Sequence, residues 1–170
     1  EDQKLAVDNL RKYCKNELQD RLKAYGDHIP RQDYLEMYKS LVDFGLVVAP
    51  IPVEDGGMGL DWKSHLLLFE EVVYTSLDLA VPFLINTVGA DVIRREGSGE
   101  MKEKYLPGLL SGDIHLSMGI SEPDVGSDVA AVKTRAVRDG DDWVINGEKV
   151  WISNGEFADL HICTCKTGEN

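Results

Sequence analysis

Residues 100–121, EMKEKYLPGLLSGDIHLSMGIS, contain the point at which the periodicity of the sequence changes. Up to Leu110 the apolar side chains recur at the spacing of a helix, and from Asp113 apolar residues alternate with polar or small ones, as in a strand. We therefore predict an α+β chain. An all-α helical domain covers residues 1–112, and the first part of an antiparallel β-sheet or barrel domain covers residues 113–170.

The helical part is predicted to contain two helices that end at Gly26 and Gly45, an ordered loop, two apolar helices and a last short helix. Asp61 follows the proline- and glycine-rich loop and is expected to cap the next helix. The runs WKSHLLLFEEVVY and VPFLINTVGADVI are expected to be buried on most sides, with Pro82 in the first turn of the second. The apolar positions of the first two helices are Leu10, Cys14, Leu18 and Leu22, then Tyr34, Tyr38, Leu41 and Val42.

Five short runs after residue 112 predict strands, namely DIHLSMGIS, VKTRAVRDG, DWVING, EKVWIS and ADLHICTC. One Asp-Gly and two Asn-Gly dipeptides separate them and favour hairpin turns. Residues two apart in a strand share a face, so Lys149, Trp151 and Ser153 are expected on one side of EKVWIS. Strands continue almost to Asn170, so we expect an unpaired sheet edge and interpret the sequence as a fragment of a longer chain.

Charge and composition exclude several classes of protein. The chain has 18 Lys and Arg against 30 Asp and Glu, and this acidic balance would repel nucleic acid or an anionic membrane surface. The three cysteines give neither a disulfide framework nor zinc-ligand spacing, so we predict no metal and a reducing compartment. No apolar run reaches the roughly 18 residues needed to span a bilayer, which predicts a soluble protein without a membrane span.

Hydroxyl groups and backbone donors gather in MGISEPDVGSDVA, residues 118–130. Together with the indole and hydroxyl of Trp151 and Ser153, they would suit a planar ligand with a polar edge. Each feature taken singly has a structural alternative, because the SEPD tetrapeptide could cap a helical turn and the residues of EKVWIS could be half-buried strand positions.

The segments SEPDVGSD and DWVINGEKVWISNGEFAD resemble the acyl-CoA dehydrogenase family, and PVEDGGMGLD, EEVVY and EKYLPGLLSGD in the helical half agree with this. The resemblance implies FAD as the cofactor. Serine stands at 121 and 153 where threonine is more usual in the family, which keeps the hydroxyl oxygen. The residues implied to contact the flavin are Met118, Gly119, Ile120, Ser121, Gly126, Ser127, Trp151, Ile152 and Ser153.

The resemblance also implies where substrate would bind. Ser127 matches a position that contacts the acyl-CoA as well as the flavin. Ala80, Val81, Leu84 and Val88 fall where the family lines the acyl chain, and Ala80, Leu84 and Val88 share one helix face. The alternative for each of these four residues is ordinary packing between helices.

The implied reaction is α,β-dehydrogenation of an acyl-CoA thioester to a 2,3-enoyl-CoA, as in fatty-acid β-oxidation. The resemblance places the glutamate base beyond Asn170, so none of Glu70, Glu71 or Glu122 is assigned as catalytic; they are expected to be solvated or to cap helices. The 170-residue chain alone is predicted to be inactive.

For the full-length enzyme, the resemblance implies a homotetramer that passes electrons to an electron-transferring flavoprotein, in the bacterial cytoplasm or the mitochondrial matrix. Two alternatives stay open. One is a flavin-dependent acyl-CoA oxidase or monooxygenase on the same scaffold, and the other is a non-catalytic binding or assembly module.

Overall fold

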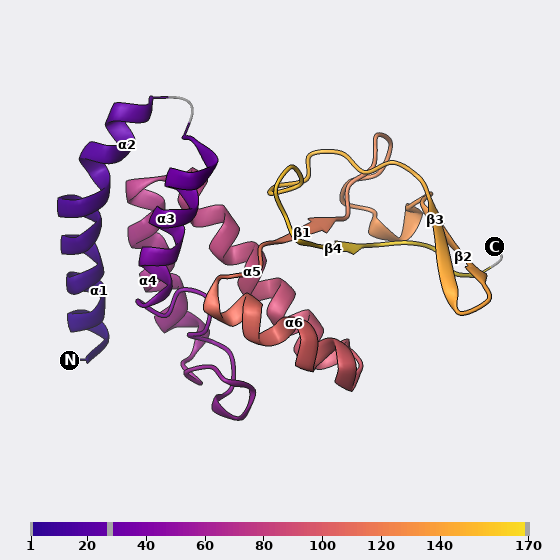
Figure 1. The fold of residues 1–170 in the computed structure, drawn as a ribbon, viewed down its shortest axis with the longest axis horizontal. Helices are drawn as coiled ribbons and strands as arrows, with labels where there is room; N and C mark the ends of the chain where they lie inside the picture. Colours follow the sequence, from indigo (N-terminus) through magenta and orange to yellow (C-terminus); the bar gives the residue numbers. More distant parts are fainter. Residues whose placement is uncertain (1, 27–28, 169–170) are drawn as a thin grey trace. The chain divides into compact units, whose positions relative to one another are not determined.

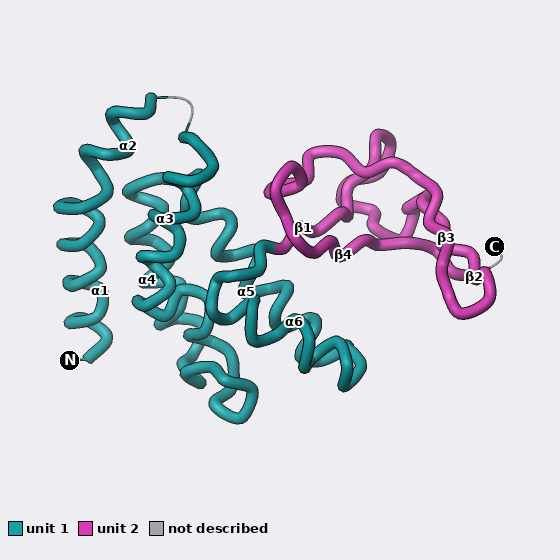
Figure 2. The backbone as a smooth tube through the Cα atoms, in the orientation of Figure 1, with its two compact units in different colours: residues 1–115 teal, residues 116–170 magenta. Residues whose placement is uncertain are grey.

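The computed structural model describes residues 2–26 and 29–168. The chain divides into two compact units, residues 1–115 and residues 116–170 (Figure 2). The division falls between residues 115 and 116, whereas the boundary predicted from periodicity lies between residues 112 and 113. The fold class is confirmed, because the first unit is helical and the second contains short strands (Figure 1).

Unit 1 contains every helix that the periodicity predicts. The first apolar stripe is present, but its helix is interrupted by a π-helical turn at Cys14–Leu18 and ends at Gly26, where φ is 61°. The elements are α1 (Asp2–Tyr13), the π-helical turn, α2 (Gln19–Tyr25), α3 (Arg31–Val42), a 3-10 turn (Val53–Asp55), α4 (Trp62–Thr75), α5 (Leu77–Glu96) and α6 (Gly99–Ser111).

Side-chain caps fix where the three later helices begin. Asp61 accepts the backbone N–H of Ser64 at 2.7 Å at the start of α4, which confirms the predicted cap. Ser76 accepts from the N–H of Leu79 at the start of α5, and Ser98 plays the same part for α6. Such a cap satisfies one of the backbone donors that the first turn of a helix leaves unpaired.

The core of unit 1 surrounds α3 and α5. The rings of Tyr38 and Phe83 stack with centroids 4.0 Å apart, and neither side chain is exposed. Asn86 is fully buried beside them and its Nδ2 donates to the hydroxyl of Tyr38 at 2.9 Å and to the carbonyl of Ile114 at 3.0 Å. Apolar side chains with at most 1% exposure complete this core, among them Leu10, Met37, Leu41, Leu46, Ile51, Leu79 and Leu109.

Two details of the predicted apolar helices are wrong. The cap at Ser76 starts α5 at Leu77, so Pro82 lies in its second turn rather than its first, where its missing N–H interrupts the helical hydrogen bonding. Helix α4 is buried on one side only: His65, Leu68 and Val72 are buried, whereas 52% of Leu66 and 78% of Tyr74 are exposed.

Within the described residues, no helix is both long and apolar enough to cross a membrane.

Within residues 116–168, the named strands of unit 2 form two separate pairs. Strands β2 (Arg135–Asp139) and β3 (Asp142–Asn146) form the antiparallel hairpin predicted at the Asp-Gly dipeptide, where Gly140 has a φ of 63°. Strands β1 (Leu116–Gly119) and β4 (Leu160–Cys163) pair in parallel, with Leu116 opposite Leu160. This parallel pairing differs from the predicted antiparallel order; a long connection over residues 120–159 gives the chain room to return in the same direction.

The strand predicted at EKVWIS is wrong. Residues 147–150 have no regular secondary structure, and Trp151 and Asn154 adopt positive φ values of 58° and 63°, which no β-strand accommodates. The shared face predicted for Lys149, Trp151 and Ser153 is therefore wrong as well. The two Asn-Gly dipeptides do not join paired strands; Asn146 ends β3, and Asn154 lies in a turn before β4.

Candidate functional site

The two predicted flavin segments, residues 118–127 and 151–153, both belong to unit 2. Met118 and Gly119 end strand β1, and Ile120 and Ser121 follow it. The backbone N–H of Val150 donates to the carbonyl of Ser121 at 3.0 Å, so the second segment begins beside the middle of the first. Residues 29 positions apart in the sequence are thus adjacent in space.

A tight turn follows Ser121. The N–H of Glu122 donates to the carbonyl of Val125 at 2.8 Å, and the N–H of Val125 donates back to the carbonyl of Glu122 at 3.1 Å, with Pro123 and Asp124 at the tip. Residues 122–125 therefore form a β-turn, and the SEPD tetrapeptide does not cap a helical turn. Gly126 and Ser127 follow this turn, and both are exposed to solvent.

Three hydroxyl groups of the candidate site have no internal partner. Among the residues that the structure describes, the side chains of Ser121, Ser127 and Ser153 make no hydrogen bond; Ser127 and Ser153 are exposed, and Ser121 is half-buried. A Cβ atom added at Gly126 would meet nothing within 4 Å, so the space beside the turn is open. Both flavin segments therefore present free hydroxyl groups.

Trp151 is the most exposed large apolar side chain of the described residues, with 92% of its surface accessible. Its φ of 58° is also unfavourable, because a side chain in the left-handed region costs about 1–2 kcal/mol relative to the right-handed one. Neither property helps the chain to fold. An exposed aromatic residue on a strained backbone is typical of a binding surface. Ile152 beside it is half-buried.

Behind these segments lies a buried ion pair that the sequence analysis did not predict. Lys149 Nζ donates to Glu122 Oε1 at 2.8 Å, and only 11% and 4% of the two side chains are exposed. The ammonium of Lys149 and the hydroxyl of Thr134 hold the pKa of Glu122 well below its usual range. Glu122 was expected to be solvated or to cap a helix, and this expectation is wrong. The hydrogen-bond partners of its carboxylate lie 11 to 27 positions away, which no local pattern indicates.

The other two carboxylates that were considered and not assigned as bases lie on α4. Glu71 is buried and accepts hydrogen bonds from both Nε and Nη2 of Arg11, at 2.9 Å and 2.6 Å. It therefore joins α4 to α1, and the expectation that it is solvated is wrong. Glu70 is exposed, as expected. In the described part of the chain, no three His, Cys, Asp or Glu side chains are grouped so that they could hold a metal ion.

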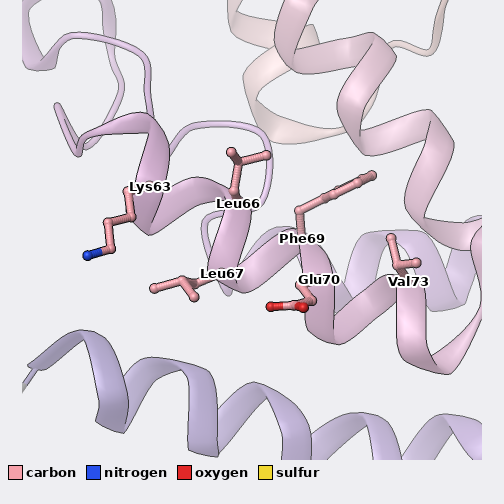
Figure 3. Close-up of a pocket in the computed structure, with 6 residues that line it drawn as sticks. All are labelled: Lys63, Leu66, Leu67, Phe69, Glu70 and Val73. Atoms are coloured by element: carbon pink, nitrogen blue, oxygen red, sulfur yellow. The ribbon is translucent and has the colours of Figure 1, made fainter.

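The residues predicted to line an acyl chain lie between positions 80 and 88 of α5. The side chain of Ala80 is fully buried in the core of unit 1, whereas Val81, Leu84 and Val88 are half-buried. A separate open hollow of about 560 Å³ lies along α4 and includes none of these four residues. Figure 3 shows its lining side chains, Lys63, Leu66, Leu67, Phe69, Glu70 and Val73.

Comparison with known proteins covers both units. The family profile of the acyl-CoA dehydrogenase N-terminal domain matches residues 1–113, and that of the acyl-CoA dehydrogenase middle domain matches residues 117–170. Cyclohexane-1-carbonyl-CoA dehydrogenase of Syntrophus aciditrophicus (strain SB) is 33% identical over all of this chain, which spans 44% of that protein. Mitochondrial isovaleryl-CoA dehydrogenase of Pongo abelii is 34% identical over 93% of this chain and 38% of its own length.

The solved structures give the same result for the fold. The crystal structure of a glutaryl-CoA dehydrogenase from Mycobacterium smegmatis in complex with FADH2 matches with a TM-score of 0.88 and 28% identity. The match covers 98% of this chain and 43% of that one. The chain thus spans less than half the length of each of these three proteins.

Proposed function

The chain belongs to the acyl-CoA dehydrogenase family, and from this we propose that it supplies the flavin-contacting segments of an FAD-dependent enzyme that converts an acyl-CoA to the 2,3-enoyl-CoA. In this proposal residues 1–112 are the N-terminal helical domain and residues 113–170 are the first part of the middle domain. The exposed and unpaired groups around Ser121 and Trp151 carry the proposal.

The residues present fit a flavin. An isoalloxazine ring needs hydrogen-bond partners along its polar edge and an apolar surface against its face. The hydroxyls of Ser121, Ser127 and Ser153 have no partner within the described chain, and the exposed indole of Trp151 offers the apolar surface. The backbone of Met118, Gly119 and Ile120, the open position at Gly126 and the half-buried Ile152 complete the proposed contact set.

FAD, when bound, would supply the acceptor for the hydride removed from the β-carbon of the substrate. The chain's own part is binding and orientation. The three serine hydroxyls would donate to the ring edge, and the indole of Trp151 would exclude water from the ring. Ser127, at the exposed end of the turn, would also contact the acyl-CoA.

No residue of this chain is proposed as the general base. Glu122 accepts four hydrogen bonds and Glu71 accepts two from Arg11, so both carboxylates are already engaged. We propose that the base lies outside residues 1–170 and that the chain alone is inactive. For the acyl group, Val81, Leu84 and Val88 are the proposed contacts, and Ala80 supports them from the core.

The partners of the complete enzyme also remain proposals from the family resemblance. They are an acyl-CoA substrate, an electron-transferring flavoprotein as the electron acceptor, and three further copies in a homotetramer, in the bacterial cytoplasm or the mitochondrial matrix.

Titration of the chain with FAD, followed by flavin fluorescence, tests the proposed cofactor site. We expect measurable binding that Trp151→Ala weakens by about 1–3 kcal/mol, or roughly 5- to 150-fold in Kd, because the variant removes a large aromatic contact. The fold should tolerate this change, since the indole packs against almost nothing. Val150→Ala is the neighbouring control and should keep the wild-type Kd. A wild-type chain that takes up no FAD, or a Trp151→Ala variant that binds equally well, would contradict the proposal.

A further inference from the structure

We propose that the buried Lys149–Glu122 pair is a positioning device, which fixes the loop that carries Trp151 and Ser153 against the segment that carries Ser121 and Ser127. The inference rests on the proposed flavin site, because it assigns a role to two residues behind that site. Neither residue belongs to the predicted contact set.

The ammonium group of Lys149 is completely used. Its three N–H donors match three acceptors: Glu122 Oε1 at 2.8 Å, Thr164 Oγ1 at 3.1 Å and the carbonyl of Ile120 at 3.2 Å. Ile120 immediately precedes Ser121, and Lys149 lies two residues before Trp151. One side chain therefore joins both flavin segments and the residue that follows β4.

Glu122 extends the same network to a fourth part of unit 2. It accepts the backbone N–H groups of Lys133 at 2.6 Å and Thr134 at 2.9 Å, and the hydroxyl of Thr134 at 2.6 Å. These residues directly precede β2, so the carboxylate anchors the turn at 122–125 to the β2–β3 hairpin. A buried carboxylate with this many donors holds a single orientation.

The stem of Lys149 adds a packing contact. A Cβ atom built at Gly119 would lie 3.3 Å from Lys149 Cγ, so the lysine chain lies close against the backbone of the first segment. Glycine at this position lets the stem of Lys149 approach the backbone.

The loop needs such a device because it is not a strand. Residues 147–150 have no regular secondary structure, and the backbone link between the two flavin segments is the single hydrogen bond from Val150 N–H to the carbonyl of Ser121. In a strand, a ladder of hydrogen bonds would hold Trp151 in place. Here the ammonium of Lys149 holds the loop before Trp151, and Asn154 Nδ2, which donates to the carbonyl of Leu116 at 3.0 Å, holds it after Ser153. Removal of the ammonium should therefore loosen the position of the indole while the hairpin stays intact.

The test compares Lys149→Met with Lys133→Met. Both replace a lysine of unit 2 by the same neutral residue, but Lys133 Nζ pairs with Asp124 at the surface, where both side chains are at least 70% exposed. We expect Lys149→Met to raise the Kd for FAD about tenfold or more, because it removes buried charged hydrogen bonds. Lys133→Met should stay within about twofold of the wild type. Equal Kd values for the two variants would overturn the proposal.

Lys149→Met leaves a buried carboxylate unpaired and could prevent folding. The double variant Lys149→Met/Glu122→Gln removes that charge while the Gln oxygen can still accept from Lys133 and Thr134. We expect it to fold, by circular dichroism, and still to bind FAD about tenfold more weakly, since the links to Ile120 and Thr164 stay absent. A double variant with the wild-type Kd, or one that also fails to fold, would show that the pair only stabilises the fold, and the proposal would be wrong.

A second readout separates this inference from the proposed function. In the absence of FAD, the amide of Val150 should exchange with deuterium about tenfold faster in the double variant than in the wild type, while the amides of the β2–β3 hairpin keep their rates. If the wild type binds no FAD but this change appears, the proposed function fails and the positioning role survives. Unchanged exchange at Val150 overturns the positioning role whatever the flavin result.

Discussion

Replacing Gly147 by alanine should destabilise unit 2 and leave unit 1 unaffected. Gly147 follows β3 directly, and a Cβ atom there would collide with Thr134, coming within 2.6 Å of its Cβ and 2.7 Å of its Cα, and meeting Oγ1 as well. Thr134 is buried and donates to Glu122, and a collision with the Cα atom cannot be relieved by a side-chain rotation. The backbone around Thr134 would have to move.

The size of the effect follows from two opposing terms. Overpacking a close contact typically destabilises by about 1–3 kcal/mol, and the backbone clash favours the upper half of that range. Replacing glycine by alanine also restricts the unfolded chain, which raises the free energy of unfolding by about 0.4–1 kcal/mol. We expect a net loss of about 1–2.5 kcal/mol, which lowers the urea midpoint by about 1 M for a small unit.

Gly126→Ala is the matched control, because a Cβ atom there meets nothing within 4 Å, so only the stabilising term applies. Both variants would be made in a Trp62→Phe background, in which tryptophan fluorescence, excited selectively over that of tyrosine, comes only from Trp143 and Trp151 of unit 2. Urea unfolding without FAD then reports on unit 2 alone. Equal midpoints for the two variants would refute the steric argument.

Three further predictions concern the core, the pH dependence and the activity. Asn86→Ala should destabilise unit 1 by about 1–3 kcal/mol in urea unfolding, because Tyr38 and the carbonyl of Ile114 lose a buried donor; a wild-type midpoint would contradict this. The pKa of Glu122 is lowered on folding, so its stabilising effect is complete above its ordinary pKa of about 4.3 and is lost as the pH falls below it. Thermal unfolding between about pH 3 and pH 7 should therefore show a shallower acid loss for Glu122→Gln than for the wild type, and parallel curves would argue against it. The chain with saturating FAD, an artificial electron acceptor and a panel of acyl-CoAs should form no enoyl-CoA, because the absence of a general base alone lowers the reaction rate about 10²- to 10⁴-fold. Product at an enzyme-like rate would mean that a base lies within residues 1–170.

Local patterns predicted the elements whose cause is local. The helix stripes, the cap at Asp61 and the hairpin at Gly140 depend on residues within a few positions of one another, and all three are present. The start of α5 was misplaced because Ser76 caps the helix before the apolar run used to predict it. Features that depend on contacts between residues far apart in the sequence were not predicted from local patterns.

EKVWIS illustrates that limit. Its alternation fits a strand, but the positive φ of Trp151 and the distant partners of Lys149 give a fixed loop instead. The parallel pairing of β1 with β4 has the same origin, since neighbours in space are far apart in sequence. The candidate flavin residues were identified by family resemblance, and their contacts remain a prediction; the structure adds that their hydroxyls are unpaired and that Lys149 lies behind them.

The left-handed conformation of Trp151 has a consequence for laboratory evolution. A library of this chain selected only for thermal stability, without any ligand, should replace Trp151 by glycine or asparagine, which tolerate positive φ and expose less apolar surface. A library selected for flavin retention should keep the tryptophan despite that strain. The residue found at position 151 would then indicate whether a library had been selected for stability or for flavin binding, because the two selections favour different residues there.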